Sequence, residues 1–307
     1  MAPGATPSDP REDVSALALV DELRLTVEPL TDGEAGDYDS LLELIGEARV
    51  VLLGVWSLGT HELFRARAEL TTRLIEDKGF MELGLPADAR AVERLHSFVQ
   101  ARTEDALAIG ALGELASFPH WVWRNAEMLD FLGWLRQYND QFSGEAHKIR
   151  IAPPDLESPR KTVVWDHSLS VGDARATSQT GPSLGQLARE RHGAHAALIG
   201  FATSGGTTIA AAGQGHPARR HVLEPAPSES VEALCRELEI PRFYLCLRGL
   251  PDRLAEALRA PRVERYVEVV FGEHDRDQTY LRARLADQFD ALIYFDATRS
   301  LEPLDLA

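Results

Sequence analysis

Residues 50–80, VVLLGVWSLGTHELFRARAELTTRLIEDKGF, decide the fold of this chain. Val50 to Val55 form an apolar run of the length of a buried strand. After a short turn, Thr60 predicts the N-cap of a helix that ends at Gly79. Strand, turn and helix in this order are typical of open α/β sheets, where side chains beyond the carboxyl ends of the strands carry out chemistry.

The rest of the chain repeats this alternation of apolar and amphipathic segments. We expect strands at residues 81–85, 148–151, 161–167, 196–203, 243–247, 266–271 and 291–296. We expect helices at residues 38–46, 88–100, 118–139, 183–192, 228–238, 252–260 and 280–289, with a turn at 204–206 and a loop at 213–220. The pattern predicts a layered α/β domain with a mainly parallel central sheet flanked by helices.

Length and composition set the domain organisation. A chain of 307 residues with 44% hydrophobic content can bury a large core. We expect residues 1–13, which are rich in Pro, Ser, Asp and Gly, to be disordered, and residues 14–307 to form a single domain. Cys235 and Cys246 both lie in apolar surroundings, so we expect buried free thiols.

The charge and the apolar runs exclude some classes of partner. The net charge of −16 argues against nucleic acid and anionic membranes, which bind basic surfaces. The amino-terminal residues have no basic segment of the kind that opens a signal peptide, and no apolar run is long enough to span a membrane. We therefore expect a soluble, cytoplasmic, acidic protein.

Several segments resemble the erythromycin esterase family. The stretch LGVWSLGT resembles the family's opening motif L-G-E-x-x-H-G-T, and the other segments that carry the resemblance are FPHWVWRN, KTVVWDHSLSVGDARAT, SLGQLARERHG and QFDALIYFDATRSLEPL. The resemblance covers most of the chain from about residue 38 to residue 304. The resemblance implies an α/β fold and, as the parent reaction, hydrolysis of a macrolactone ester by a histidine base and carboxylates without a cofactor. It also implies that the family's long helical insertion is missing, because only residues 153–160 connect the flanking strands.

The sequence departs from the family where the family is thought to carry out chemistry. The glutamate and histidine of the opening motif are Val55 and Leu58, and the glutamate after the second strand is Pro86. In the family's W-A-H-N-x-H motif the first histidine is kept as His167, but the second is Ser170. Pro86 can neither accept a proton nor orient one, and the loss of several of these groups together should leave little hydrolysis.

The polar residues that remain define the candidate site. In the catalytic hypothesis, His167 is the general base and Asp173 or Glu62 is the orienting carboxylate. The candidate substrate-binding residues are Trp121, Arg124, Asn125, Arg175, Arg276, Tyr280 and Arg299. In the structural alternative, His167 is a satisfied core histidine, Trp121 packs in the core, and Arg124, Asp173 and Arg175 pair to hold loops. We predict no metal site, since position 65 is Arg and His61-Glu62 does not continue as H-E-x-x-H.

Three functions follow from this pattern. The first is a divergent erythromycin esterase-like protein with an eroded hydrolytic site, which binds or tailors a macrocyclic or peptide-like secondary metabolite. The second is an active hydrolase of a small or macrolactone ester that uses His167 as general base. The third is a non-catalytic interaction partner of a biosynthetic or resistance enzyme. In each case we expect no cofactor and neither nucleic acid nor membrane as a partner.

Overall fold

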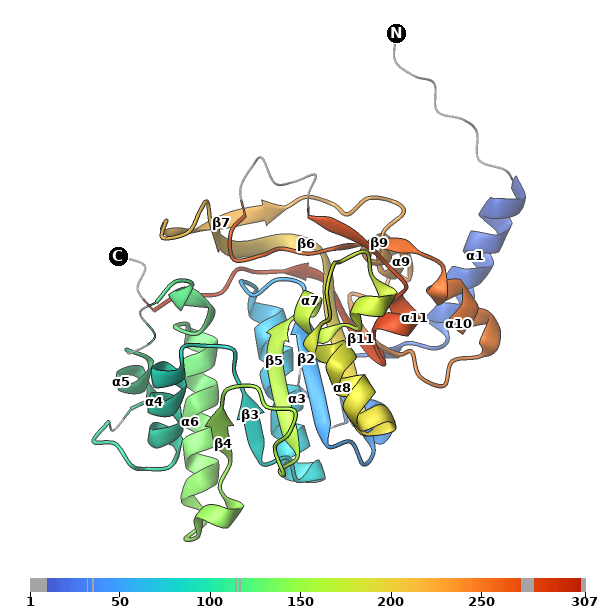
Figure 1. Cartoon of the computed structure of the whole chain (residues 1–307). Coiled ribbons are helices and arrows are strands. Elements are labelled where there is room, and N and C mark those ends of the chain that lie inside the picture. The colour runs from blue at the N-terminus through green and yellow to red at the C-terminus, as the bar shows by residue number, and fades with distance from the viewer. Residues whose placement is uncertain are drawn as a thin grey trace.

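The computed structural model describes residues 10–31, 33–34, 36–105, 107–113, 115, 117–271 and 279–304. Its core is a nine-stranded sheet, to which both halves of the chain contribute strands (Figure 1). The strands are β1 (Glu28–Pro29), β2 (Val50–Val55), β3 (Glu82–Gly84), β4 (Arg150–Ala152), β5 (Thr162–His167), β6 (Ala196–Ala211), β7 (Ala218–Leu223), β8 (Arg242–Cys246) and β11 (Ala291–Thr298). Their order is β1-β8-β11-β6-β2-β5-β3-β4, and β7 pairs with β6.

The predicted parallel sheet is confirmed for the strands that surround β2. The pairs β2–β5, β2–β6, β3–β5, β3–β4 and β6–β11 are parallel, whereas β1, β7 and β8 pair antiparallel with their neighbours. A strand with parallel partners on both sides is buried on both faces. This explains why every residue of β2 is apolar or glycine and why all six are buried.

The helix after β2 begins and ends where the sequence predicts. α3 spans His61–Lys78, and Gly79 ends it in the left-handed conformation at φ 68°. Thr60 occupies the N-cap position, but its hydroxyl donates to the carbonyl oxygen of Ser57 and caps no amide of the helix. The turn is therefore stabilised by this internal hydrogen bond.

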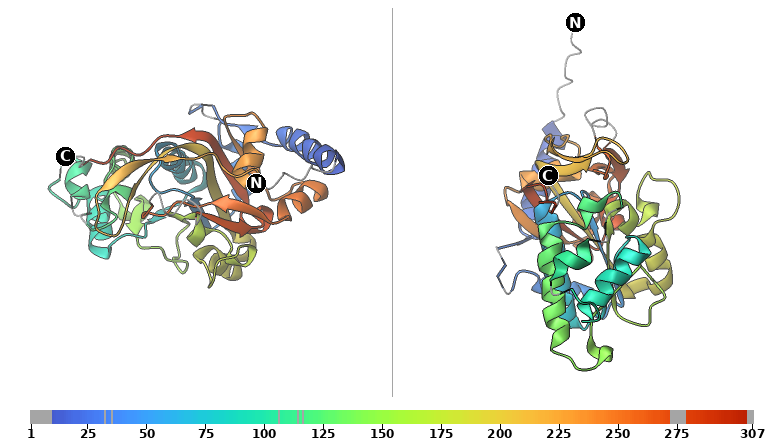
Figure 2. Two further views of the ribbon diagram at one scale, coloured as in Figure 1. Left: turned by 90° about the horizontal axis from the view of Figure 1, so that it is seen from above. Right: turned by 90° about the vertical axis from the view of Figure 1, so that its left-hand side faces the viewer.

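The alternation of side chains along β2 separates two cores. Val51, Leu53 and Val55 face one core, and Val50 and Leu52 face the other. The first core packs beneath α2 (Asp39–Ile45), α3, α4 (Ala89–Val99), α5 (Ala108–Leu112) and α6 (Ala126–Asp140). The second packs beneath α1 (Pro10–Arg24), α7 (Ser168–Val171), α8 (Leu184–His192), α9 (Val231–Glu237), α10 (Asp252–Arg259) and α11 (Leu285–Gln288). Figure 2 shows α6 and α8 on opposite sides of the sheet.

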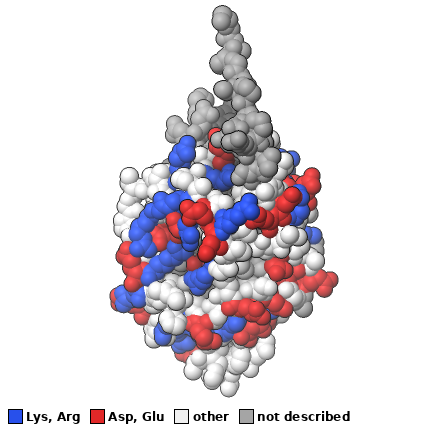
Figure 3. Space-filling view, turned by 90° about the vertical axis from the view of Figure 1, so that its right-hand side faces the viewer, with Lys and Arg blue, Asp and Glu red and all other residues white. Residues whose placement is uncertain are grey.

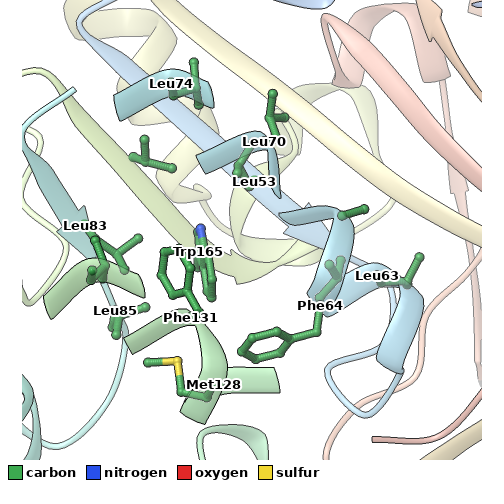
Figure 4. Packing of buried hydrophobic residues seen from close by; sticks show 14 of the residues in the cluster. Leu53, Leu63, Phe64, Leu70, Leu74, Leu83, Leu85, Met128, Phe131 and Trp165 are labelled. Carbon is green, nitrogen blue, oxygen red and sulfur yellow. The ribbon is translucent and has the colours of Figure 1, made fainter. Parts of the chain in front are cut away.

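Aromatic side chains fill the first core beside β5. Trp165 stacks on Phe131 of α6 with ring centroids 4.8 Å apart, and Phe64 of α3 meets it edge-on at 5.3 Å (Figure 4). The indole Nε1 donates to the hydroxyl of Thr71 at 2.8 Å. This pairing satisfies the polar atom that a buried tryptophan brings into a core.

Several sequence-based assignments are wrong. Residues 204–206 do not form a turn, because β6 runs on through them and pairs with β7, which includes only the last three residues of the predicted 213–220 loop. Residues 266–271 form no regular strand; instead β9 (Arg262–Arg265) precedes them. The predicted helix 280–289 begins as β10 (Tyr280–Ala283), which pairs antiparallel with β9, and becomes helical only at α11.

Short 3-10 helices complete the chain. They are η1 (His120–Val122), η2 (Glu145–His147), η3 (Ala174–Ala176) and η4 (Gly193–His195). At the amino end, α1 begins at Pro10, inside the range expected to be disordered, and residues 1–9 lie outside the described part. Among the described residues, none of the helices combines the length and the apolar character needed to cross a bilayer.

Candidate functional site

The carboxyl ends of β2 and β5 lie side by side and carry the candidate base. Val55 pairs with His167, and Gly54 with Asp166. The chain then turns at once into α7, which packs on Gly54: a Cβ added there would lie 2.7 Å from Cβ of Val171. Glycine is therefore required for α7 to approach the strand closely.

In its neutral form, His167 presents no exposed lone pair to a bound water. Its Nδ1 accepts a hydrogen bond from the amide of Leu169 at 3.2 Å, which makes it the N-cap of α7. The neutral ring then carries its proton on Nε2, which is buried and makes no hydrogen bond within the described residues. Burial lowers the pKa of His167 to about 4, and backbone groups of Val267 and Trp56 offset this only in part.

Trp56 covers the carboxyl ends of β2 and β5, which we call the closed or carboxyl edge of the sheet. Its ring meets His167 edge-on at 5.9 Å and Phe289 at 6.4 Å, and only 2% of the residue is exposed. The segment after β9 lies across it, since the amide of Val267 donates to the carbonyl oxygen of Trp56 at 2.7 Å. Aromatic and backbone groups thus fill the space in front of His167.

A buried cation lies beside this edge. The guanidinium of Arg67 sits 4.4 Å from the ring centroid of Trp165 and 5.1 Å from that of Phe64, and the residue is 1% exposed. Its Nε and Nη1 make no hydrogen bond within the described residues. Burial lowers the pKa of Arg67 to about 9, while the charge of Asp166 acts in the opposite direction.

Asp166 is the acidic residue whose charge acts on Arg67. Burial raises the pKa of its carboxyl group, although Ser170, the His167 amide and Arg67 each favour the charged form. The hydroxyl of Ser168, next to this cluster in sequence, is also buried without a hydrogen bond in the described structure. Arg67 was missed by the sequence analysis, but a signal existed: it lies four residues after Leu63 and three before Leu70, on the buried stripe of α3.

A second histidine has the opposite character. Nδ1 of His61, at the start of α3, lies 2.5 Å from a carboxylate oxygen of Glu127 in the first turn of α6. The hydrogen bond to Glu127 raises the pKa of His61 against the effect of burial. Glu127 is 8% exposed at its side chain and His61 25%. The pair joins two helices that are far apart in sequence, and only His61 was considered before, for a zinc motif, so sequence spacing gave no indication of the pair.

Glu62 is bound to Arg299. It accepts from the Arg299 amide at 2.6 Å and from Arg299 Nε at 2.9 Å, and these residues line a cavity of about 140 Å³ together with His61. Asp173, the other expected orienting group, caps η3 and pairs with Arg175 and Arg189. Neither carboxylate hydrogen-bonds to His167 in the described structure.

Asp173 belongs instead to a mixed-charge surface near α8 and α11. Arg189 joins it to Asp290, which also pairs with Arg248. Figure 3 shows basic and acidic side chains gathered together on the face of the molecule on this side. The arrangement fits the structural alternative, in which these charges hold loops together.

The other expected binding residues are dispersed. Trp121 is 1% exposed and packs edge-on against Phe118, and Asn125 is fully buried as the N-cap of α6, where it accepts from the Met128 amide. Arg124 lies between them in sequence, and its Nε is buried. Tyr280 accepts hydrogen bonds from Arg265 at 2.8 and 3.1 Å. Arg276 lies outside the described residues.

Comparison with known proteins identifies the family to which this architecture belongs. The model of the erythromycin esterase family matches residues 75–160 and 153–298. The chain belongs to the erythromycin esterase family. The two matched segments meet at residues 153–160, which is the short connection where the sequence analysis expects the family's helical insertion to be missing.

Solved structures share the family fold. A protein from Bacillus cereus matches with a TM-score of 0.81 at 15% identity, covering 97% of this chain and 100% of its own. A succinoglycan biosynthesis protein matches with a TM-score of 0.79 at 14% identity, covering 94% and 99%. A mutant of the erythromycin esterase EreC in its open conformation matches at 0.64 and 12%, covering 92% and 99%. At these identities the likeness concerns the fold alone.

Within the erythromycin esterase fold, one cavity adjoins the closed edge. It has a volume of about 270 Å³ and lies between β7, the 225–227 loop and the hairpin of β9 and β10. Apolar side chains make up much of its lining, with Arg265, Thr279 and Tyr280 among the polar ones. Val267, which lies against Trp56, also lines it. A mostly apolar cavity with a few polar groups is typical of a small-molecule site.

Proposed function

We propose that this member of the erythromycin esterase family binds a macrocyclic or peptide-like metabolite without hydrolysing it. The observation that carries the proposal is the state of His167. A general base needs a free lone pair within reach of the water that it activates. In His167 the Nδ1 lone pair accepts the Leu169 amide, and Nε2 is buried behind Trp56.

The loss of a base has a large expected effect. A positioned general base contributes about 10² to 10⁴ to the rate, and the family's other implied groups are Val55, Leu58, Pro86 and Ser170 in this chain. The pKa of about 4 keeps His167 neutral near pH 7, but its neutral form has no lone pair to offer. The ligand would occupy the 270 Å³ cavity beside Tyr280.

Mass spectrometry with a binding assay tests this proposal. The purified protein is incubated with a panel of macrolactones and cyclic peptides, and products are sought by their gain in mass from water. Thermal unfolding is followed on the same panel, because a ligand that binds only the folded state raises its stability. We expect stabilisation by at least one compound and no product.

Two variants locate the site. Val222→Arg places a charged chain at a residue that lines the cavity and is 63% exposed, and it should abolish the stabilisation. Leu187→Arg, at a residue 44% exposed on α8, is the matched control and should keep it. A product that forms with the wild type and disappears in His167→Ala would overturn the proposal in favour of hydrolysis.

Hydrolysis is the second candidate, and one observation favours it. Glu127 orients Nδ1 of His61, and the ring lines the 140 Å³ cavity with Glu62 and Arg299. A histidine held by a carboxylate is the arrangement of many general bases. If product forms with His167→Ala but not with His61→Ala, this pair carries the reaction.

A further inference from the structure

A polar cavity lies at the amino ends of β3, β4 and β5, at the opposite end of the strands from His167. We call this end the open or amino edge of the sheet. Its volume is about 300 Å³. The residues that line it come from α4, η2, β4 and the loop before β5: His96, Gln100, Arg102, Glu145, Ala146, Arg150 and Arg160. These elements lie on the side of the molecule shown at the right of Figure 2. Three arginines around one cavity contrast with the net charge of −16.

The positive charges of this cavity exceed the negative ones. Arg102 pairs with Glu145, the acidic residue of the lining. Arg150 approaches the buried carboxylate of Glu82 only to 3.9 Å, at the limit of an ion pair. For the Arg160 guanidinium the described residues provide no ion pair. At least one arginine, and in part a second, thus lacks a close counter-charge.

His96 adds a further donor. It is 9% exposed, and its Nδ1 lies 3.4 Å from the Ile151 amide, so the neutral ring carries its proton on Nε2. Burial lowers the pKa of His96, and so do the charges of Arg150 and Arg102, against those of Glu93 and Glu145. An anion in the cavity would oppose both arginine effects.

We propose that this cavity binds the phosphate group of a small phosphomonoester. Guanidinium forks match the geometry of phosphate oxygens and can bind them through two parallel hydrogen bonds. A phosphomonoester has three terminal oxygens that can accept from more than one guanidinium, whereas a carboxylate has two. The volume exceeds that of an inorganic phosphate, so there is room for a small organic group.

The site does not depend on the proposed metabolite binding at the other edge. Arg160 belongs to the short 153–160 connection, where the two segments of the family match meet. The connection that replaces a longer segment thus supplies part of the cavity wall. The opposite cavity near Tyr280 shares no residue with it.

Isothermal titration of the full chain with inorganic phosphate, sulfate and glucose 6-phosphate, at constant ionic strength, tests the proposal. Arg150→Gln and Arg160→Gln should each weaken glucose 6-phosphate binding by about tenfold or more, the loss expected when a hydrogen bond to a charged group is removed. Arg253→Gln is the control, because this arginine is 68% exposed and pairs with Glu22 on α1. Both substituted cavity arginines are at least partly exposed, so the variants should fold, as circular dichroism can verify.

The His96 ring gives a second readout. Sulfate does not titrate near neutral pH, so a rise in the pKa of His96 on sulfate addition, followed by NMR, reports the anion itself. The rise should be lost in Arg150→Gln and kept in Arg253→Gln. Equal binding by all the variants, or an unchanged pKa of His96 at saturating sulfate, would show that anions only screen the surface, and would overturn the proposal.

Discussion

The carboxyl and amino edges of the central sheet differ in how far their polar side chains are exposed to solvent. At the carboxyl edge, Trp56 and the segment around Val267 cover His167, and Arg67 is buried between aromatic rings. At the amino edge, Arg150 and Arg102 remain about half exposed around a cavity. The same sheet therefore has a carboxyl edge at which His167 is covered and an amino edge at which charged side chains stay exposed around a cavity.

The difference shows that the connections, more than the strands, decide where a ligand can bind. The segment 266–271 covers the carboxyl edge, where the Val267 amide donates to the carbonyl oxygen of Trp56. The short 153–160 connection leaves the amino edge open. Burial disfavours the charged form of His167, whereas the side chains of Arg102 and Arg150 are about half exposed. Substitutions at the two edges should therefore differ in kind and in size.

The largest effect is expected for Trp56→Ala at the closed edge. Removing a buried indole leaves a cavity and should lower the free energy of unfolding by about 3–5 kcal/mol. Urea unfolding followed by circular dichroism measures it. A loss below about 1 kcal/mol, the range of ordinary substitutions, would mean that Trp56 does not seal this edge.

The acid sensitivity of the closed edge should come in part from His167. Its pKa is lowered from 6.5 to about 4, so the folded state favours the neutral ring. The resulting stability is complete above pH 6.5 and is lost as the pH falls toward 4. In His167→Asn, which can still cap α7, the fall in stability between pH 7 and pH 5 should be smaller than in the wild type. Equal falls in both proteins would contradict the buried neutral histidine.

His61 provides the opposite pH dependence near the same edge. Its pKa is raised, so the contribution of the His61–Glu127 pair is complete below 6.5 and is lost as the pH rises through the folded-state value. Glu127→Gln should cost about 1.5–3 kcal/mol at low pH, as for a hydrogen bond to a charged group, and less at alkaline pH. Unfolding free energies at pH 6 and pH 9 measure this, and a cost that is the same at both would refute it.

The smallest effect is expected at the open edge. Arg160→Gln should change the free energy of unfolding by no more than about 0.5 kcal/mol, because the described structure shows no ion pair of this side chain. Urea unfolding in a buffer free of phosphate and sulfate measures it. A larger loss would mean that the open edge, like the closed one, relies on its polar groups for stability.

Local sequence patterns correctly predicted those parts of the fold whose secondary structure depends on residues within the same segment. The β2–α3 unit is an example, since the apolar run from Val50 and the glycine at 79 are sufficient to place it. Residues 280–289 were misassigned, because a segment with Leu281 and Ala283 buried fits a helix or a strand until β9 pairs with it. The strand predicted at 196–203 is confirmed as the first half of β6, but its continuation to Ala211 was missed, since glycines at 205 and 206 usually indicate a turn.

The sequence by itself determined the family and the mainly parallel sheet. Only the tertiary structure decided what His167 can do, because its protonation depends on Leu169, Trp56 and Val267 together. It also decided which charges meet. Arg102, Arg150 and Arg160 come from separate segments, and Glu127 reaches His61 from another helix. Such contacts depend on how elements pack, which no local pattern along the chain encodes.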